Sequence, residues 1–173
     1  MSERSVSRIQ RIILISSIVV TVVVLDQITK SIARDTLRNA GIVRIVGDFF
    51  VFRYAENSGA FLSLGASWPP VVRAIVFGAL SGLVVIAAVV YVAVDATLTV
   101  GQIVGLSLLI GGGVGNLIDR VTRQGSVVDF MNIGYGRLRT GIFNVADLML
   151  ISGGIVFLVV SARKRRPGEL DAE

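Results

Sequence analysis

The stretch Gly111–Asp147, GGGVGNLIDRVTRQGSVVDFMNIGYGRLRTGIFNVAD, determines how the rest of the chain must be arranged. It carries Asp119, Asp129 and Asp147 against or inside apolar segments that would normally exclude them. An ionised carboxylate at membrane depth is costly unless it is paired or faces water, so such acids usually mark a functional site. This stretch is therefore the first place to look for chemistry.

Asp129 and Asp147 lie near the two ends of one polar excursion between apolar runs. A segment that leaves the membrane and returns can bring its ends together. Two neighbouring carboxyl groups share one proton, because both cannot ionise at close range. The pattern predicts a pair of acids of the kind that aspartic proteases use to activate water.

The composition indicates a membrane protein. Of 173 residues, 53% are hydrophobic and 17% charged, and the mean hydropathy is +0.78, which is more apolar than a soluble domain needs for its core. The chain has no cysteine and no histidine, so thiol chemistry and the commonest general base and metal ligand are excluded. Acid–base work would fall on carboxylates, Lys30 or tyrosine.

The sequence predicts an all-α membrane protein with a single integral domain, residues 1–173. The spans are expected at about 12–29, 71–94, 98–118 and 143–160, each long enough to cross roughly 30 Å of hydrocarbon. They leave two larger connections, at about 30–70 and 119–142. The first run follows a basic start like a signal peptide, but no small-x-small cleavage site follows it, so we expect it to be retained.

Basic residues gather at the chain ends and at the edges of the apolar runs. This placement indicates charge at a membrane edge and not nucleic-acid binding, despite the net charge of +5. Four spans put both ends on one side, and the positive-inside rule places them in the cytoplasm. The two larger connections are also basic, yet this orientation sets the acid-bearing segments on the outer face.

Polar residues lie at the end of the first apolar run and at the start of the connection that follows it. Asp26 and Lys30 are four apart on one helical face, either as an interfacial ion pair or as a pair that orders the site or contacts substrate. Residues 31–39 could continue as a short polar helix. Residues 42–54 are rich in β-branched and aromatic residues and predict strands with a hairpin at Gly47-Asp48, resting on the membrane surface. Asn57-Ser58-Gly59 predicts a turn.

The third run contains many glycines, which we expect to allow close helix packing. At its end Asn116, Asp119 and Arg120 share a face, and Asp119 is expected to form an ion pair with Arg120 or to cap the turn, a structural role. Val127–Phe130 predicts a short strand or interfacial segment that presents Asp129.

Asn144 and Asp147 open the fourth run on one face. Helix capping alone would explain an acid there, but Asp147 is expected to lie too far inside the run for a cap.

Five sequence blocks occur in register with the four spans. They are Asp26-Gln-x-Thr-Lys30, Asn57-x-Gly59, Gly115-Asn116-Leu-Ile-Asp119-Arg120, Val128-Asp129-Phe130 and Phe143-Asn144-x-Ala146-Asp147. With these blocks the chain resembles lipoprotein signal peptidase (signal peptidase II) over nearly its whole length. One departure is Ala60-Phe61-Leu62, where the family's usual form has one more small residue before the phenylalanine.

The resemblance implies a four-helix membrane bundle with a small extracytoplasmic β-cradle and a short interfacial helix. It implies a bacterial inner-membrane enzyme that cleaves diacylglyceryl-modified prolipoproteins just before the lipidated cysteine. Asp129 and Asp147 would be catalytic. The residues implied to bind substrate or support the site are Asp26, Lys30, Asn57, Gly59, Asn116, Asp119, Arg120, Asn144 and Ala146. No metal, cofactor or nucleic acid is expected, the partners are the substrate and membrane lipid, and the protein is expected to be a monomer.

Three other classes remain open. Intramembrane acids also serve as relays in transporters or channels, although these acids lie at the ends of runs and no internal repeat is visible. Three acids could bind magnesium in a membrane phosphotransferase. A purely structural subunit would explain the spans and glycines, but not the polar residues at their outer ends.

Overall fold

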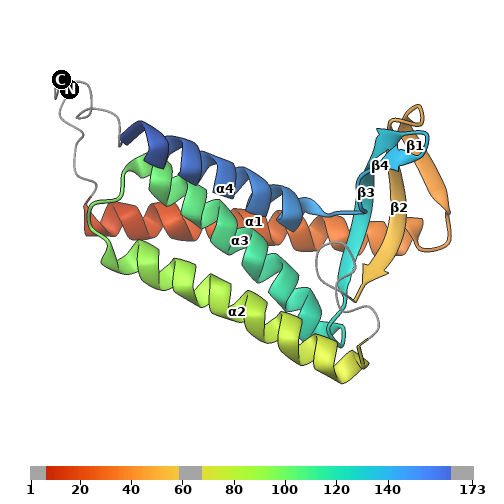
Figure 1. Ribbon diagram of the computed structural model, residues 1–173, viewed down its shortest axis with the longest axis horizontal. Helices are drawn as coiled ribbons and strands as arrows, with labels where there is room; N and C mark the ends of the chain where they lie inside the picture. Colours follow the sequence, from red (N-terminus) through yellow and green to blue (C-terminus); the bar gives the residue numbers. More distant parts are fainter. Residues whose placement is uncertain (1–6, 59–67, 165–173) are drawn as a thin grey trace, which may run out of the picture.

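The computed structural model describes residues 7–58 and 68–164, which form four long helices and one four-stranded antiparallel sheet. The order along the chain is α1(Arg8–Leu37), β1(Ile42–Val46), β2(Phe50–Asn57), α2(Pro70–Val94), α3(Val100–Thr122), β3(Val127–Tyr135), β4(Leu138–Arg139) and α4(Val145–Lys164). The sheet order is β1-β2-β3-β4. Figure 1 shows the sheet at one end of the helix bundle, with its strands running across the helix axes.

The four helices are long and apolar enough to cross a membrane. They contain most of each apolar run expected from the sequence, and α3 and α4 begin two residues later than expected and continue further. The α2–α3 turn, the start of α1 and the end of α4 lie together at the end of the bundle away from the sheet (Figure 1). There Arg11 of α1 donates to the carbonyl groups of Val92 and Asp95, which closes the end of α2.

Helix α3 packs against all three other helices, and its glycines make this possible. A Cβ added at Gly105 would lie 2.8 Å from the backbone nitrogen of Phe157 in α4, and one added at Gly112 would collide with the carbonyl oxygen of Ala146. A Cβ at Gly111 would lie 2.8 Å from Val22 of α1. The glycines predicted to serve close packing therefore lie where α3 touches its neighbours, two of them against the backbone of α4 and Gly111 against a side chain of α1.

Helix α1 extends beyond the apolar run in which it begins. Its 30 residues span about 45 Å at 1.5 Å per residue, more than the hydrocarbon needs. Residues 31–39 were expected as a short polar helix, and of these residues 31–37 form the last two turns of α1. Among residues 7–58 and 68–164 there is no separate short helix, so the implied interfacial helix is not found in the described chain.

The sheet begins with the hairpin expected from the sequence. Strands β1 and β2 pair antiparallel around a turn at Gly47, where φ is +52°, a conformation that glycine adopts at little cost. Strand β3 pairs with β2 over nearly its whole length and is longer than the short segment predicted around Asp129. The two-residue strand β4 was not predicted.

An apolar core fastens the sheet to the bundle. Ala33 and Leu37 on the last turns of α1 pack with Phe130 and Met131 of β3. Phe52 of β2 meets Phe130 edge to face, with ring centroids 5.9 Å apart. The extension of α1 thus fixes β3, and with it Asp129, against the ends of the helices.

Candidate active site

Asp147 lies in the first turn of α4 and is part of its cap. Its backbone nitrogen donates to Oδ1 of Asn144 at 2.9 Å, and its own Oδ2 accepts from the backbone nitrogen of Asn144 at 3.2 Å. This reciprocal pair is a capping box. The expectation that Asp147 lies too far inside the run for a cap was wrong, because α4 begins at Val145 and Asp147 is its third residue.

Asp129 lies on β3 opposite Ala55 of β2, and its side chain is buried at 2% exposure. Its Oδ2 accepts from the amide of Asn57 at 3.1 Å, and its Oδ1 accepts from the amide of Asn144 at 2.7 Å. The pairing of β2 with β3 therefore brings Asn57 to Asp129 from 72 positions away.

Asn144 joins the two acids. Its backbone binds Asp147, while its side-chain nitrogen donates to Asp129. Asn116 of α3 adds a second link: its Nδ2 donates to Oδ1 of Asp147 at 2.8 Å, and its Oδ1 accepts from Nδ2 of Asn144 at 3.1 Å. Two asparagines thus hold the two carboxyl groups beside each other.

Burial and the neighbouring acid change the acidity of Asp129. Burial is the largest cause, followed by the negative charge of Asp147, and together they raise the pKa of Asp129 from 3.8 to about 7. The hydrogen bonds from Asn57 and Asn144 act in the opposite direction. A carboxyl group with this pKa can hold a proton near neutral pH, as a general acid must.

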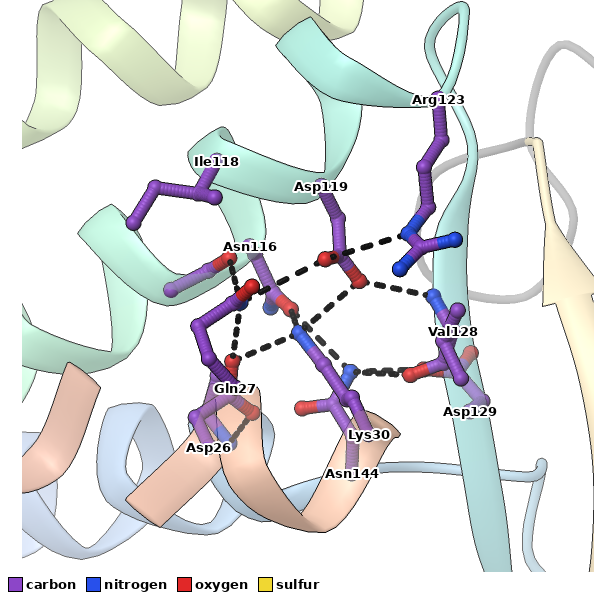
Figure 2. Close-up of polar contacts among 12 residues, drawn as sticks. Asp26, Gln27, Lys30, Asn116, Ile118, Asp119, Arg123, Val128, Asp129 and Asn144 are labelled. Carbon is purple, nitrogen blue, oxygen red and sulfur yellow. Dashed lines mark hydrogen bonds and ion pairs between the residues drawn. The ribbon is translucent and has the colours of Figure 1, made fainter. Parts of the chain in front are cut away.

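A second cluster, formed by Asp26, Lys30 and Asp119, lies beside Asn116 and Asn144 (Figure 2). The ammonium nitrogen of Lys30 is 2.8 Å from Oδ2 of Asp26 and 3.2 Å from Oδ2 of Asp119, and all three side chains are almost fully buried. Lys30 also donates to Oδ1 of Asn116 at 3.0 Å. Its three N–H groups therefore each have an acceptor.

This arrangement decides between the two interpretations of Asp26 and Lys30. The pair exists and is buried within the protein, and it is connected to Asp147 through Asn116, which accepts from Lys30 and donates to Asp147. Asp26 further accepts from the backbone nitrogen of Ala146 at 2.9 Å. The cluster therefore positions the start of α4.

Two small residues make room for this contact. A Cβ at Gly115 would lie 2.6 Å from Oδ2 of Asp26. Ala146 is fully buried, and its carbonyl oxygen is the atom that a Cβ at Gly112 would meet. Larger side chains at these positions would displace Asp26 from the α4 backbone.

Asp119 and Arg120 do not form the ion pair that was expected. Besides Lys30, Asp119 pairs with Nε of Arg123 at 3.5 Å and accepts from the backbone nitrogen of Val128 at 2.9 Å. Arg120 donates to the carbonyl of Gly125 at 3.1 Å and lies over the ring of Phe77. It also interacts electrostatically with Asp129 and Asp147. Asp119 thus fixes the start of β3 at Val128, which directly precedes Asp129.

Most of the residues singled out from the sequence meet in one connected region. They are Asp26, Lys30, Asn57, Asn116, Asp119, Arg120, Asp129, Asn144, Ala146 and Asp147. Gly59 lies outside the described residues.

Sequence reasoning overlooked Gln27 and Arg123. Gln27 donates to Asp26, to Asp119 and to the carbonyl of Gly115. Arg123 could have been found, because it lies one helical turn after Asp119. In the described part of the chain, no three acidic side chains gather as a group that could hold a metal.

Comparison with known proteins agrees with this geometry. A family model described as signal peptidase (SPase) II matches residues 18–163. The chain belongs to the signal peptidase II family. Among curated relatives, the lipoprotein signal peptidase of Treponema denticola is 35% identical over 138 residues, covering 78% of this chain and 80% of that one. That of Chlorobium phaeobacteroides is 35% identical over 147 residues, covering 80% and 83%.

Solved structures show the same architecture. Two structures of bacterial membrane enzymes superpose with TM-scores of 0.76 and 0.74, at 30% and 29% sequence identity. They cover 92% and 93% of this chain, and 93% and 97% of their own. With its four candidate spans, this member of the family is a multi-pass bacterial membrane protein.

Proposed function

We propose that the protein is an aspartic endopeptidase of the membrane that removes signal peptides from diacylglyceryl-modified prolipoproteins, cleaving before the lipidated cysteine. The relatives that it matches are lipoprotein signal peptidases. The observation that carries the proposal is that Asn144 donates hydrogen bonds to both acids. Its side-chain nitrogen is 2.7 Å from Oδ1 of Asp129, and its backbone nitrogen is 3.2 Å from Oδ2 of Asp147.

The two acids have different environments, which suits different roles. The pKa of Asp129, raised to about 7, lets it keep a proton at neutral pH. Asp147 lies at the N-terminus of α4, where the helix dipole and two N–H donors stabilise negative charge. We assign Asp129 as the protonated acid and Asp147 as the ionised base of a pair that titrates together.

The reaction then follows from these protonation states. Asp147 takes a proton from a water molecule as the water oxygen attacks the scissile carbonyl carbon, and Asp129 gives its proton to the carbonyl oxygen. When the tetrahedral intermediate collapses, the carbon–nitrogen bond breaks. Asp147 returns its proton to the leaving amine, and Asp129 recovers one from the hydroxyl that becomes the carbonyl. No covalent intermediate or metal takes part.

The orientation belongs to the same proposal. Both termini are assigned to the cytoplasm and the sheet to the outer face, which puts the dyad where lipid meets the exterior. The apolar signal helix of the substrate can then pack beside the spans while its acyl chains stay in the bilayer. The enzyme is proposed to act as a monomer.

Isosteric variants test the chemistry. Asp129→Asn and Asp147→Asn should each lower the rate of signal-peptide release by about a thousandfold or more, because each removes one partner in proton transfer. The measurement is cleavage of a purified lipidated precursor, with thermal unfolding in detergent as a check on folding. Near wild-type release by folded Asp129→Asn would show that the dyad assignment is wrong.

Substrate and metal controls separate this proposal from its rivals. Removing the acyl chains from the precursor should weaken cleavage sharply, and equal cleavage of an unlipidated precursor would contradict the substrate assignment. Chelators should leave cleavage unchanged, whereas a magnesium-dependent phosphotransferase would lose its activity. Proton or cation flux in proteoliposomes would indicate a transporter.

A further inference from the structure

The two turns at the tip of the sheet lie side by side and are held together. The backbone nitrogen of Gly134 donates to the carbonyl of Phe49 at 2.9 Å, which joins the β3 end to the β1–β2 turn. Arg139 of β4 donates to the carbonyl of Asp48 at 2.7 Å and to the side chain of Asn132. The tip is therefore one ordered surface and not two independent turns.

This surface, the hairpin tip, exposes large apolar side chains. Tyr135 is 81% and Leu138 87% exposed, and Val46, Phe49 and Ile45 are each about half exposed or more. Single exposed apolar residues need no explanation, but five gathered on adjoining turns indicate a contact with a membrane or a protein. None of them takes part in the site around Asp129.

Exposed arginines surround the hairpin tip. Arg44 and Arg137 adjoin it and are exposed, as is Arg53 further along β2. Asp48 is the acid within this group, and it is already paired with Arg44 at 3.7 Å and Arg139 at 3.4 Å. The surface therefore has an excess of positive charge. In the proposed orientation it lies on the outer face of the membrane, where the positive-inside rule does not predict such an excess.

A shallow cavity lies on the sheet beside the tip. Its volume is about 220 Å³, and its polar lining consists of Arg53, Arg139, Asn132 and Asp48, the acid already paired with Arg139. The Nη2 atom of Arg139 is buried and has no hydrogen-bond partner among the described residues. Guanidinium groups around a cavity of this kind suit a phosphate group.

The orientation of the sheet indicates the partner. The strands run across the helix axes, and the two turns project past the side of the bundle formed by α4 (Figure 1). A strand that lies across membrane-spanning helices runs along the membrane surface, so the tip reaches over the lipid beside the bundle. Apolar and aromatic residues with arginines around them are typical of segments that lie in the interface of anionic membranes.

We propose that the hairpin tip docks on the adjacent membrane surface, with its apolar side chains among the lipids and its arginines on the phosphates of anionic phospholipids. This inference goes beyond the peptidase activity and does not depend on the dyad. It accounts for Arg44 and Arg137, one exposed arginine from each of the two larger connections. It also predicts that the position of the sheet over the bundle depends on lipid charge.

The absence of cysteine from the chain allows a direct test. Leu138→Cys, placed in the full chain with Asp129→Asn so that no cleavage interferes, carries one fluorophore. Glu56→Cys at the opposite end of β2 is the matched control. Each protein is reconstituted at one copy per nanodisc, in phosphatidylcholine alone or with phosphatidylglycerol, and quenching is measured with doxyl groups on the lipids and with iodide in water.

We expect phosphatidylglycerol to increase doxyl quenching and decrease iodide quenching at position 138, with little change at position 56. Arg44→Gln and Arg137→Gln should each lower the ratio of docked to undocked tip about fivefold, since each arginine adds to the attraction of an anionic surface. Val46→Cys gives a second position and should behave like Leu138→Cys.

Three outcomes would overturn the proposal. Equal access of iodide to positions 138 and 56 in every lipid mixture would show that the tip stays in water. Protection that requires two copies per disc would show that it binds a second copy of the chain. Protection that requires added prolipoprotein would show that it binds substrate. Because no outcome is read from catalysis, each leaves the proposed peptidase activity untouched.

Discussion

Two pairs of aspartates lie side by side in this protein and have opposite surroundings. Asp26 and Asp119 share the ammonium group of Lys30, at 2.8 and 3.2 Å. Asp129 and Asp147 are instead held by amide groups of asparagines, and within the described residues neither has a cation within 4.0 Å. The first pair shares one buried cation, and Arg123 lies beside Asp119 as well, while the second pair is held by neutral donors.

The difference shows that a buried carboxylate gets its role from its partners. Removing one partner of a buried ion pair leaves a buried charge without compensation, so such a pair fixes the geometry of the segments that it joins. A pair held by neutral donors keeps its geometry and can still exchange a proton. Asn116 contacts both regions, so the fixed cluster can orient the reactive one without neutralising it.

The largest expected effect comes from removing the shared cation. Lys30→Met should lower the free energy of unfolding by roughly 5 kcal/mol, at the upper end of the range for breaking a buried pair, because Asp26 loses its cation and Asp119 keeps only Arg123. Denaturant titration in detergent measures this. Arg38→Gln is the control, since its pair with Glu56 is exposed and 3.9 Å long, and it should change stability by less than about 0.5 kcal/mol. A similar loss of unfolding free energy in both variants would show that the buried Lys30 contributes no more to stability than the exposed Arg38.

The second effect is a pH dependence due to Asp129. Its pKa is about 7 when folded, against an ordinary value of 3.8, so the folded state binds the proton more tightly than the unfolded state. The resulting stability is present at pH 4 and is lost as the pH rises through 7. The loss is on the order of 4 kcal/mol, from about three pKa units at 1.36 kcal/mol each.

Comparison of the wild type with Asp129→Asn isolates this contribution, since all other groups titrate in both. Free energies of unfolding measured from pH 4 to 8 should fall more steeply in the wild type. Cleavage by the wild type should also decline above about pH 7, as the pair loses its shared proton. Parallel stability curves would show that Asp129 does not hold a proton near neutrality.

A smaller effect is expected at the residue that connects the two regions. Asn116→Ala removes a donor to Asp147 and an acceptor for Lys30, which should cost about 1–3 kcal/mol for each buried group left unpaired. We expect cleavage to fall roughly tenfold to a hundredfold and the pH profile of the remaining activity to shift. A loss of stability with an unchanged pH profile would make Asn116 a packing residue only.

The smallest effect concerns the space behind Asp26. Gly115→Ala would place a Cβ 2.6 Å from the Asp26 carboxylate and should destabilise the protein by about 1–3 kcal/mol. Gly154→Ala in α4 is the matched control, because a Cβ there meets nothing within 4 Å. Thermal unfolding of both variants in detergent is the measurement. Equal unfolding temperatures would mean that Asp26 can move without cost.

Some features of the site follow from residue spacing. Asp26 and Lys30 had to be neighbours on a helix, and Asn144 and Asp147 had to lie in one turn, because both relations are local. The capping role of Asp147 was missed because it depends on where α4 begins, and helix ends shift easily by two residues. The pairing of Asp119 was missed for another reason: its cation, Lys30, comes from α1, 89 positions earlier in the sequence.

The sequence alone determined the membrane class, the four apolar runs, the first hairpin and the identity of the unusual acids, because hydropathy and local spacing depend on neighbouring residues. The tertiary structure decided which acids lie against a buried cation and which are held by asparagine side chains. That choice depends on β2 bringing Asn57 to Asp129 and on α3 bringing Asn116 to Lys30 and Asp147. These contacts join segments distant in the chain, and they form only when β2 pairs with β3 and α3 packs against α1 and α4.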